Sequence, residues 1–151
     1  EESGCALQVG ADRVTIQAPK RLRSVGPVRT MPYPGFPTDA QSPLMAAMCL
    51  AQGTTVFTEN IFENRYRHCA ELMRMGADIQ VEGRLALVRG VDHLTGSAVK
   101  ATDLRGGAAM VVAGLAAQGE TIISEIDHID RGYEKIEKAY AQLGACIRRE
   151  E

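Results

Sequence analysis

Apolar and polar residues alternate in two stretches of the chain, and each stretch predicts a β-hairpin. Gly-Ala-Asp at 10–12 forms the turn of the first, and Glu-Gly-Arg at 82–84 forms the turn of the second. Such alternation places one face of a strand against a core and the other in water. The predicted strands are residues 6–9 and 13–18 in the first hairpin, and 79–81 and 85–88 in the second.

Further stretches place apolar residues at helical spacing, and each is followed by a glycine that suits the end of a helix. We expect Pro43 in the first turn of the first of these helices. The predicted helices are residues 44–52, 64–75, 104–118 and 132–143, ended by Gly53, Gly76, Gly119 and Gly144. β-branched residues predict strands at 54–59 and 120–124, and a last strand without an evident partner is expected at 145–151.

The segment 50–66 recurs at 116–132, which lies 66 positions further along the chain. In this register Glu59 corresponds to Glu125, and Arg65 corresponds to Arg131. A period this long is a whole unit of helices and strands rather than one turn of a solenoid. Because each unit mixes both element types, the pattern excludes a β-sandwich and a helical bundle, and it predicts an α/β assembly of repeated units.

Repeats of this kind usually bury their apolar faces against neighbouring repeats, so we expect this sequence to be part of a longer protein. Residues 1–19 are assigned to a hairpin from a preceding, truncated repeat. Residues 20–101 form the first full repeat and residues 102–151 the last, within one domain.

Composition narrows the function classes. The 151 residues are 45% hydrophobic and 24% charged, as in an ordinary globular domain. A net charge of −2 and the absence of tryptophan argue against nucleic acid and anionic lipid as partners. With no apolar run long enough to cross a bilayer and no signal peptide, we expect a cytoplasmic protein.

The four cysteines are scattered, without the spacing of a metal site, so we expect no metal ligation and reduced thiols. Cys69 follows His68, which would suit an activated thiolate. Both residues lie in a predicted amphipathic helix, however, so packing of Cys69 in the core is favoured.

Arginines recur at predicted helix starts. Arg65 and Arg131 occupy equivalent places in the two repeats, and Arg105 begins a third helix. Backbone N–H groups at a helix start already favour anions, so an added guanidinium predicts an anion site. The alternative is a structural ion pair with a neighbouring carboxylate such as Glu63 or Asp130.

Two further segments could support a ligand. Gly106 and Gly107 would let backbone N–H groups approach a phosphate or carboxylate, although a tight turn into a closely packed helix explains them equally well. The proline-rich segment 33–39 delivers Asp39 rigidly to a helix start. There Thr38 or Asp39 could instead simply cap the helix.

Four motifs in this order resemble the UDP-N-acetylglucosamine enolpyruvyltransferase family, namely 33–39 (YPGFPTD), 62–65 (FENR), 102–105 (TDLR) and 128–134 (HIDRGYE). The resemblance covers nearly the whole chain. It implies repeated β-α-β-α-β-β units of an inside-out α/β barrel, with helices inside and sheets outside. This chain then corresponds to the carboxy-terminal portion, an incomplete domain.

The resemblance also implies roles for individual residues. Asp39 matches the aspartate that binds the sugar 3-hydroxyl and is the proposed base, and Ile61 and Phe62 match positions that contact the sugar nucleotide. Arg65 matches an arginine near the reacting groups. Arg105 and Arg131 match arginines that hold phosphoenolpyruvate, whose phosphate and carboxylate suit bidentate donors. The implied reaction transfers enolpyruvate to UDP-N-acetylglucosamine in peptidoglycan synthesis, without a metal or another cofactor.

The chain departs from the family pattern. The family's loop cysteine, its amino-terminal lysine-asparagine pair and its other domain have no counterpart here, so we expect the chain alone to be inactive. Pro43 and the 105–107 segment also differ locally from the usual residues. Two alternatives stay open: the related enzyme that acts on shikimate 3-phosphate, and a non-catalytic paralogue that binds sugar nucleotide.

Overall fold

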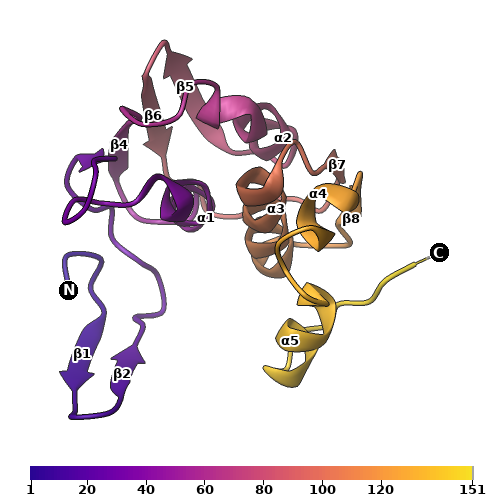
Figure 1. The fold of residues 1–151 in the computed structure, drawn as a ribbon, viewed down its shortest axis with the longest axis horizontal. Helices are drawn as coiled ribbons and strands as arrows, with labels where there is room; N and C mark the ends of the chain where they lie inside the picture. Colours follow the sequence, from indigo (N-terminus) through magenta and orange to yellow (C-terminus); the bar gives the residue numbers. More distant parts are fainter. Residues whose placement is uncertain (151) are drawn as a thin grey trace.

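The computed structural model describes residues 1–150, which form an α/β structure with helices inside and sheets outside (Figure 1). The strands are β1 (Ala6–Val9), β2 (Val14–Gln17), β3 (Val28–Arg29), β4 (Thr54–Thr58), β5 (Asp78–Glu82), β6 (Leu85–Arg89), β7 (Ala98–Lys100) and β8 (Ile122–Ser124). The helices are α1 (Thr38–Met48), the 3-10 turn η1 (Arg65–His68), α2 (Cys69–Arg74), α3 (Leu104–Ala116), α4 (Asp127–Asp130) and α5 (Ile136–Gln142).

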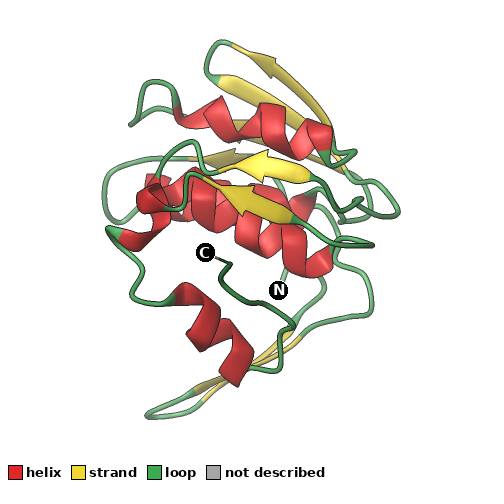
Figure 2. Cartoon of the chain, turned by 90° about the vertical axis from the view of Figure 1, so that its right-hand side faces the viewer, coloured by secondary structure: helices red, strands yellow, loops and turns green. Residues whose placement is uncertain are grey.

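The strands form three separate sheets. β3, β4, β6 and β5 lie in that order, with β3 parallel to β4 and the other pairs antiparallel. β7 and β8 form a parallel pair, and β1 and β2 form the predicted first hairpin. Figure 2 shows strands and helices in alternating layers, with the hairpin and one short helix set apart from this layered body. The expected mixture of strands and helices in one assembly is confirmed.

The repeat is visible in the backbone. α1 and α3 begin at Thr38 and Leu104, which are 66 positions apart, and each helix follows a short parallel strand. The two helices pack against each other at the centre of the structure (Figure 1). Gly53 and Gly119 hold the same positive-φ conformation, at 109° and 90°, just before the strand that follows each helix.

The main core lies between α1, α3 and the four-stranded sheet. Apolar spacing brings Met45 of α1, Phe57 of β4 and Met110 of α3 into this core, where none of them is exposed. Leu72 of α2 closes the same cluster. Burying each of these side chains contributes about 1.5–3 kcal/mol relative to exposure, so the core stabilises the position of both long helices.

The first long helix differs from its sequence prediction. α1 begins at Thr38 rather than at residue 44, and Pro43 lies inside the helix rather than in its first turn. The added turn contains Gln41 and Ser42, which are polar yet fully buried, so apolar periodicity could not reveal it. The helix also ends at Met48 instead of continuing to residue 52.

The carboxy-terminal part differs more. A short helix, α4, was not predicted, and α5 begins at Ile136 rather than at residue 132 because Lys135 adopts a left-handed conformation with φ of 46°. Residues 145–150 form no strand, so that prediction is wrong for the part of it that the structure describes. Glu151 lies outside the described residues.

The β1–β2 hairpin stands away from the core, as Figure 1 shows. Its apolar side chains are exposed, with Val9 at 76% and Ile16 at 63%. Within residues 1–150, no helix is both long and apolar enough to span a bilayer.

Gly90, which follows β6, has its backbone against the carbonyl of Ala51, where a Cβ atom would overlap that carbonyl oxygen. We expect Gly90→Ala to lower the free energy of unfolding by about 2 kcal/mol or more, because the backbone of the 49–53 turn must move. Gly26→Ala is the control, since its Cβ would meet only a flexible glutamate at ordinary contact distance. Urea unfolding followed by circular dichroism measures both, and equal stability of the two variants would contradict the close approach.

Candidate anion-binding site

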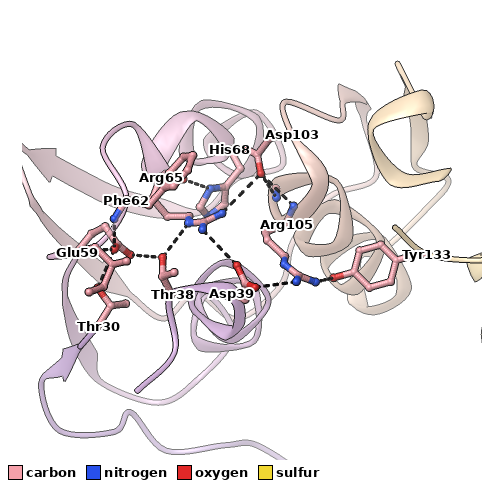
Figure 3. Close-up of polar contacts among 12 residues, drawn as sticks. Thr30, Thr38, Asp39, Glu59, Phe62, Arg65, His68, Asp103, Arg105 and Tyr133 are labelled. Carbon is pink, nitrogen blue, oxygen red and sulfur yellow. Dashed lines mark hydrogen bonds and ion pairs between the residues drawn. The ribbon is translucent and has the colours of Figure 1, made fainter. Parts of the chain in front are cut away.

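Charged side chains gather where the amino-terminal ends of α1 and α3 meet the loop after β4. Figure 3 shows Asp39, Arg65, Asp103 and Arg105 pointing toward one another across this junction. They come from three separate motifs that the sequence analysis singled out, and the fold brings them together. The arrangement offers two guanidinium groups and two carboxylates within one small volume.

Asp39 links the two arginines. Its Oδ2 accepts a hydrogen bond from Nη2 of Arg105 at 2.8 Å, and its Oδ1 accepts one from Nη2 of Arg65 at 3.4 Å. Asp39 and Arg105 are the second residues of α1 and α3, so they occupy equivalent positions in the repeat. The hydrogen bond from Arg105 is the main reason why the pKa of the Asp39 carboxyl lies below its ordinary value.

Neither Thr38 nor Asp39 caps α1, which overturns the capping alternative. The N-cap of this helix is Pro37, which has no side-chain hydrogen bond to offer. The Thr38 hydroxyl instead donates to Oε2 of Glu59 at 3.0 Å and accepts from Nε of Arg65 at 3.1 Å. Both side chains of the α1 start are therefore used to connect this helix to other elements.

Arg65 begins η1, as expected from its place before a helix, and only 6% of its side chain is exposed. Its guanidinium lies 4.4 Å from the centroid of the Phe62 ring, within the range of a cation–π contact. Beyond Asp39, its Nη1 is 3.9 Å from Oδ1 of Asp103. The alternative of a structural ion pair holds for Arg65 with other partners than Glu63, since the arginine reaches Asp39 of α1 and Asp103 before α3.

Arg105 is held at the start of α3 by two partners. Its Nη1 donates to the hydroxyl of Tyr133 at 2.8 Å, and its Nη2 donates to Asp39. The side chain keeps 28% of its surface exposed, and its guanidinium carbon lies 5.7 Å from the centroid of the Tyr133 ring. These hydrogen bonds from Arg105 to Asp39 and Tyr133 also raise the pKa of the guanidinium, which stays charged at any accessible pH.

The backbone at the α3 start does not form the phosphate cradle that the glycine pair suggested. Asp103 occupies it, because its Oδ1 accepts from the backbone N–H groups of Arg105 at 3.0 Å and Gly106 at 2.9 Å. A Cβ at Gly107 would lie 2.6 Å from Ile129. Gly107 therefore serves the close packing of α3 against α4, and Gly106 lies close to Thr102 and His68, in agreement with the alternative of a tight turn into a closely packed helix.

Arg131 does not belong to this cluster. It is exposed at the carboxy-terminal end of α4 rather than at a helix start, and it forms no ion pair with another residue in 1–150. The suggested partner Asp130 is bound by Arg149, whose guanidinium donates to both carboxylate oxygens at 2.7 and 2.8 Å. Tyr133, two residues beyond Arg131, is the residue of this segment that reaches the site.

Ile61 and Phe62 form the exposed rim of the loop after β4, with 46% and 53% of their surfaces accessible. Their backbone N–H groups both donate to Oε1 of Glu59 at 2.8 Å. Burial raises the pKa of Glu59, but these hydrogen bonds and those from Thr30 and Thr38 bring it below the ordinary value. Glu59 is thus an ionised carboxylate, and sequence reasoning noted it only as a repeated residue.

Cys69 packs in the core, as the favoured interpretation held. It is 1% exposed, and burial raises the pKa of its thiol to about 12, which rules out a thiolate at neutral pH. Within residues 1–150, no three His, Cys, Asp or Glu side chains gather where a metal ion could bind.

Comparison with known proteins identifies the fold family. Residues 1–139 match the family model of EPSP synthase (3-phosphoshikimate 1-carboxyvinyltransferase). The chain belongs to this family. In structure the chain is similar to the enolpyruvyl transferase NikO from Streptomyces tendae, with a TM-score of 0.86 at 32% identity over 97% of this chain. The inside-out α/β arrangement expected from the sequence is confirmed.

The curated relatives are named for the sugar-nucleotide enzyme of the family. UDP-N-acetylglucosamine 1-carboxyvinyltransferase 2 from Caldanaerobacter subterraneus is 52% identical over 97% of this chain, and its counterpart from Clostridium acetobutylicum is 53% identical over 99%. The resemblance stated from the four motifs is confirmed. EPSP synthase from Acinetobacter baumannii has a TM-score of 0.59 at 19% identity, so it shares the fold alone.

The chain spans about a third of these proteins. It covers 35% of both sugar-nucleotide enzymes and 34% of NikO. The domain seen here is therefore partial relative to the proteins it matches.

Replacement of Arg105 should remove the main hydrogen bond to the Asp39 carboxylate. We expect Arg105→Gln to raise the pKa of the Asp39 carboxyl, because the main group that stabilises its charge is lost. Carbon-13 NMR titration of the aspartate side chains measures this pKa. Arg21→Gln is the control, since Arg21 pairs with Asp92 at 2.8 Å and does not contact Asp39. An unchanged Asp39 pKa in Arg105→Gln would show that the ion pair is not formed in solution.

Acid should weaken the structure through His68. This residue is 0% exposed, its Nδ1 lies 2.9 Å from the carbonyl of Arg65, and burial lowers its pKa to about 4. The unfolded chain therefore binds more protons between the ordinary pKa near 6.5 and pH 4, and the free energy of unfolding falls as the pH falls through this window. We expect a loss of about 2–4 kcal/mol from this group.

Variants separate the effect of His68 from that of the carboxylates. His68→Asn keeps a donor toward the Arg65 carbonyl but cannot be protonated, so its stability should fall less between pH 6.5 and pH 4 than that of the wild type. His93→Asn, at an exposed position, should follow the wild type. Denaturant unfolding at several pH values measures the difference, and parallel curves for wild type and His68→Asn would refute the assignment.

Proposed function

We propose that the protein containing this chain transfers enolpyruvate from phosphoenolpyruvate to the 3-hydroxyl of UDP-N-acetylglucosamine, a step of peptidoglycan synthesis that takes place in the cytoplasm. The observation that supports it most is the meeting of Asp39, Arg65 and Arg105 in one site. The chain that carries these residues is 52–53% identical to relatives named for this sugar nucleotide. The role of each residue described below is part of this proposal.

In the proposed reaction, Asp39 accepts the proton of the sugar 3-hydroxyl as its oxygen adds to C2 of phosphoenolpyruvate. A proton is added at C3, which gives a tetrahedral intermediate. This intermediate then loses a proton from C3 as phosphate leaves with the electrons of its C–O bond, and the C2–C3 double bond of the product is restored. Arg105 holds an anionic group of phosphoenolpyruvate, and the exposed Arg131 supplies a second guanidinium when the cleft closes. Fixed positive charges stabilise the departing phosphate better than water does.

The ion pair between Asp39 and Arg105 bears on the timing of this chemistry. With Arg105 bound to it, Asp39 is a weak base, because its pKa lies below the ordinary value. An anion of the substrate that engages Arg105 would weaken this hydrogen bond and raise the pKa of Asp39. The base would then gain strength when phosphoenolpyruvate is in place.

The remaining parts of the site must come from the rest of the protein. The chain spans about 35% of the relatives, and the exposed apolar hairpin and the partly exposed side chain of Arg105 suit contact with another part of the enzyme. Ile61 and Phe62 would contact the sugar nucleotide on the rim of the site, with Arg65 beside the reacting groups. By itself the chain is expected to bind sugar nucleotide weakly and to be inactive.

Phosphate release by the protein that contains this chain tests the proposal. With phosphoenolpyruvate and UDP-N-acetylglucosamine, we expect turnover that Asp39→Ala lowers by about a hundredfold or more, as expected for the loss of a general base. Asp78→Ala is the matched control, because Asp78 is exposed on β5 and pairs with Arg89 at 3.2 Å rather than with a residue of the site. Its turnover should equal that of the wild type.

Three outcomes would overturn the proposal. Phosphate release that is indifferent to Asp39→Ala would remove the assigned base. Release that requires shikimate 3-phosphate as acceptor would indicate the other branch, for which the family model is named. Binding of the sugar nucleotide without any turnover would identify a non-catalytic paralogue.

A further inference from the structure

A buried carboxylate that no proposed chemical step uses lies directly behind the site. Glu59, the residue directly after β4, is 3% exposed. Its Oε1 accepts hydrogen bonds from the hydroxyl of Thr30 and from the backbone N–H groups of Ile61 and Phe62, each at 2.8 Å, and its Oε2 accepts from Thr38 at 3.0 Å. Within residues 1–150, no cation forms a direct ion pair with it.

Burial of an ionised group is costly unless several donors compensate for the lost water. All four donors to Glu59 are neutral, so the nearest compensating charge must act through one of them. That charge is Arg65, which is also buried and whose Nε donates to Thr38 at 3.1 Å. Figure 3 shows the resulting chain from Arg65 through Thr38 to Glu59, a buried ion pair with a hydroxyl between the two charges.

The chain has a fixed direction because a hydroxyl carries one proton. Since Glu59 is acceptor only, the Thr38 proton must point at it, and the oxygen lone pairs are then left for Nε of Arg65. A planar guanidinium fixed at Nε has a defined plane, which directs its Nη atoms toward Asp39 and Asp103. Without the carboxylate, the Thr38 hydroxyl is free to donate to Asp39 instead, and Arg65 loses its anchor.

The same carboxylate also shapes the rim. By accepting from two successive backbone N–H groups, Glu59 orients the loop that carries Phe62, whose ring lies under the guanidinium of Arg65. The arginine is therefore fixed at its edge through Thr38 and at its face through Phe62, and both contacts depend on Glu59.

The repeat offers an internal comparison. Glu125 is the equivalent of Glu59, yet it is exposed and forms an ion pair with Lys100 at 3.0 Å. The second repeat forms β8, the equivalent of β4, without a buried carboxylate after the strand. The buried arrangement of Glu59 is thus not required by the repeated unit, and the copy that has it is the copy whose arginine faces the site.

We propose that Glu59 is a positioning residue of the anion-binding site, which acts through the Thr38 hydroxyl to fix the plane of the Arg65 guanidinium toward Asp39. The proposal rests on the proposed function for its effect on turnover, but not for the geometry itself. Misplacement of a binding group by about 1 Å lowers turnover by up to about a hundredfold. We therefore expect Glu59→Gln to lower kcat/KM for phosphoenolpyruvate by about tenfold to a hundredfold.

Threonine variants test the route of the effect. Thr38→Val removes the hydroxyl while keeping the shape of the side chain, so it should lower kcat/KM nearly as much as Glu59→Gln. It also tests the proposal if Glu59→Gln does not fold. Thr38→Ser keeps the hydroxyl and should retain the wild-type kcat/KM. The double variant Thr38→Val with Glu59→Gln should lose no more than Glu59→Gln alone, because both changes break one chain. Glu125→Gln is the control and should be unchanged.

A second readout does not depend on activity. Nitrogen-15 NMR of the chain reports the Arg65 Nε–H group, which should be protected from exchange in the wild type and in Thr38→Ser, and exposed to exchange in Thr38→Val and Glu59→Gln. If this pattern holds but the whole protein releases no phosphate, the proposed function fails and the positioning role stands. Wild-type protection or wild-type kcat/KM in Thr38→Val, or additive losses in the double variant, would overturn the positioning role.

Discussion

The packing of α1 against α3 is the contact on which the rest of the structure depends. The two helices come from successive repeats, and their buried faces carry small residues such as Ala46 and Ala109, which allow a close approach. Because both helices enter this contact at their amino-terminal ends, their second residues meet. The ion pair between Asp39 and Arg105, which lie 66 residues apart in the sequence, is therefore a direct result of the packing of these two helices.

Charge compensation then determines which side chains can serve a ligand. Asp103 and Glu59 accept hydrogen bonds from backbone N–H groups. Their oxygens stabilise the start of α3 and the loop after β4, so they are not available to bind a ligand. Asp39 and Arg105 satisfy each other but remain partly exposed. A ligand can displace such a pair at lower cost than a buried one, because water still screens both charges.

Sequence patterns predicted most of this fold, and the failures have a physical cause. The two hairpins and the strand after α1 followed from alternation, and α3 followed from helical spacing that began at the predicted residue. The start of α1 was missed because Gln41 and Ser42 are polar residues in a buried position. The strand expected at the end of the chain failed because a strand needs a partner, which residue periodicity alone does not report.

The site was predictable in its members but not in its connections. Arg65 and Arg105 were found from their places before helices, and Asp39 from the rigid segment that precedes it. The partners of Arg65 were not predicted, because the sequence suggested only a neighbour such as Glu63. In the structure Arg65 pairs with Asp39 and Asp103, which lie 26 and 38 positions away. Tyr133 carried no signal of its own, although its motif contributed to the resemblance that the comparisons confirm.

The equivalence of positions 39 and 105 bears on how such a site could arise. In a newly duplicated chain both positions would carry the same residue, and two aspartates or two arginines at a contact distance of 2.8 Å would repel each other. The ion pair could form only after the two copies had come to differ at this position. The fold uses two similar repeats, whereas the ion pair at their contact requires the repeats to differ at the second residue of each long helix.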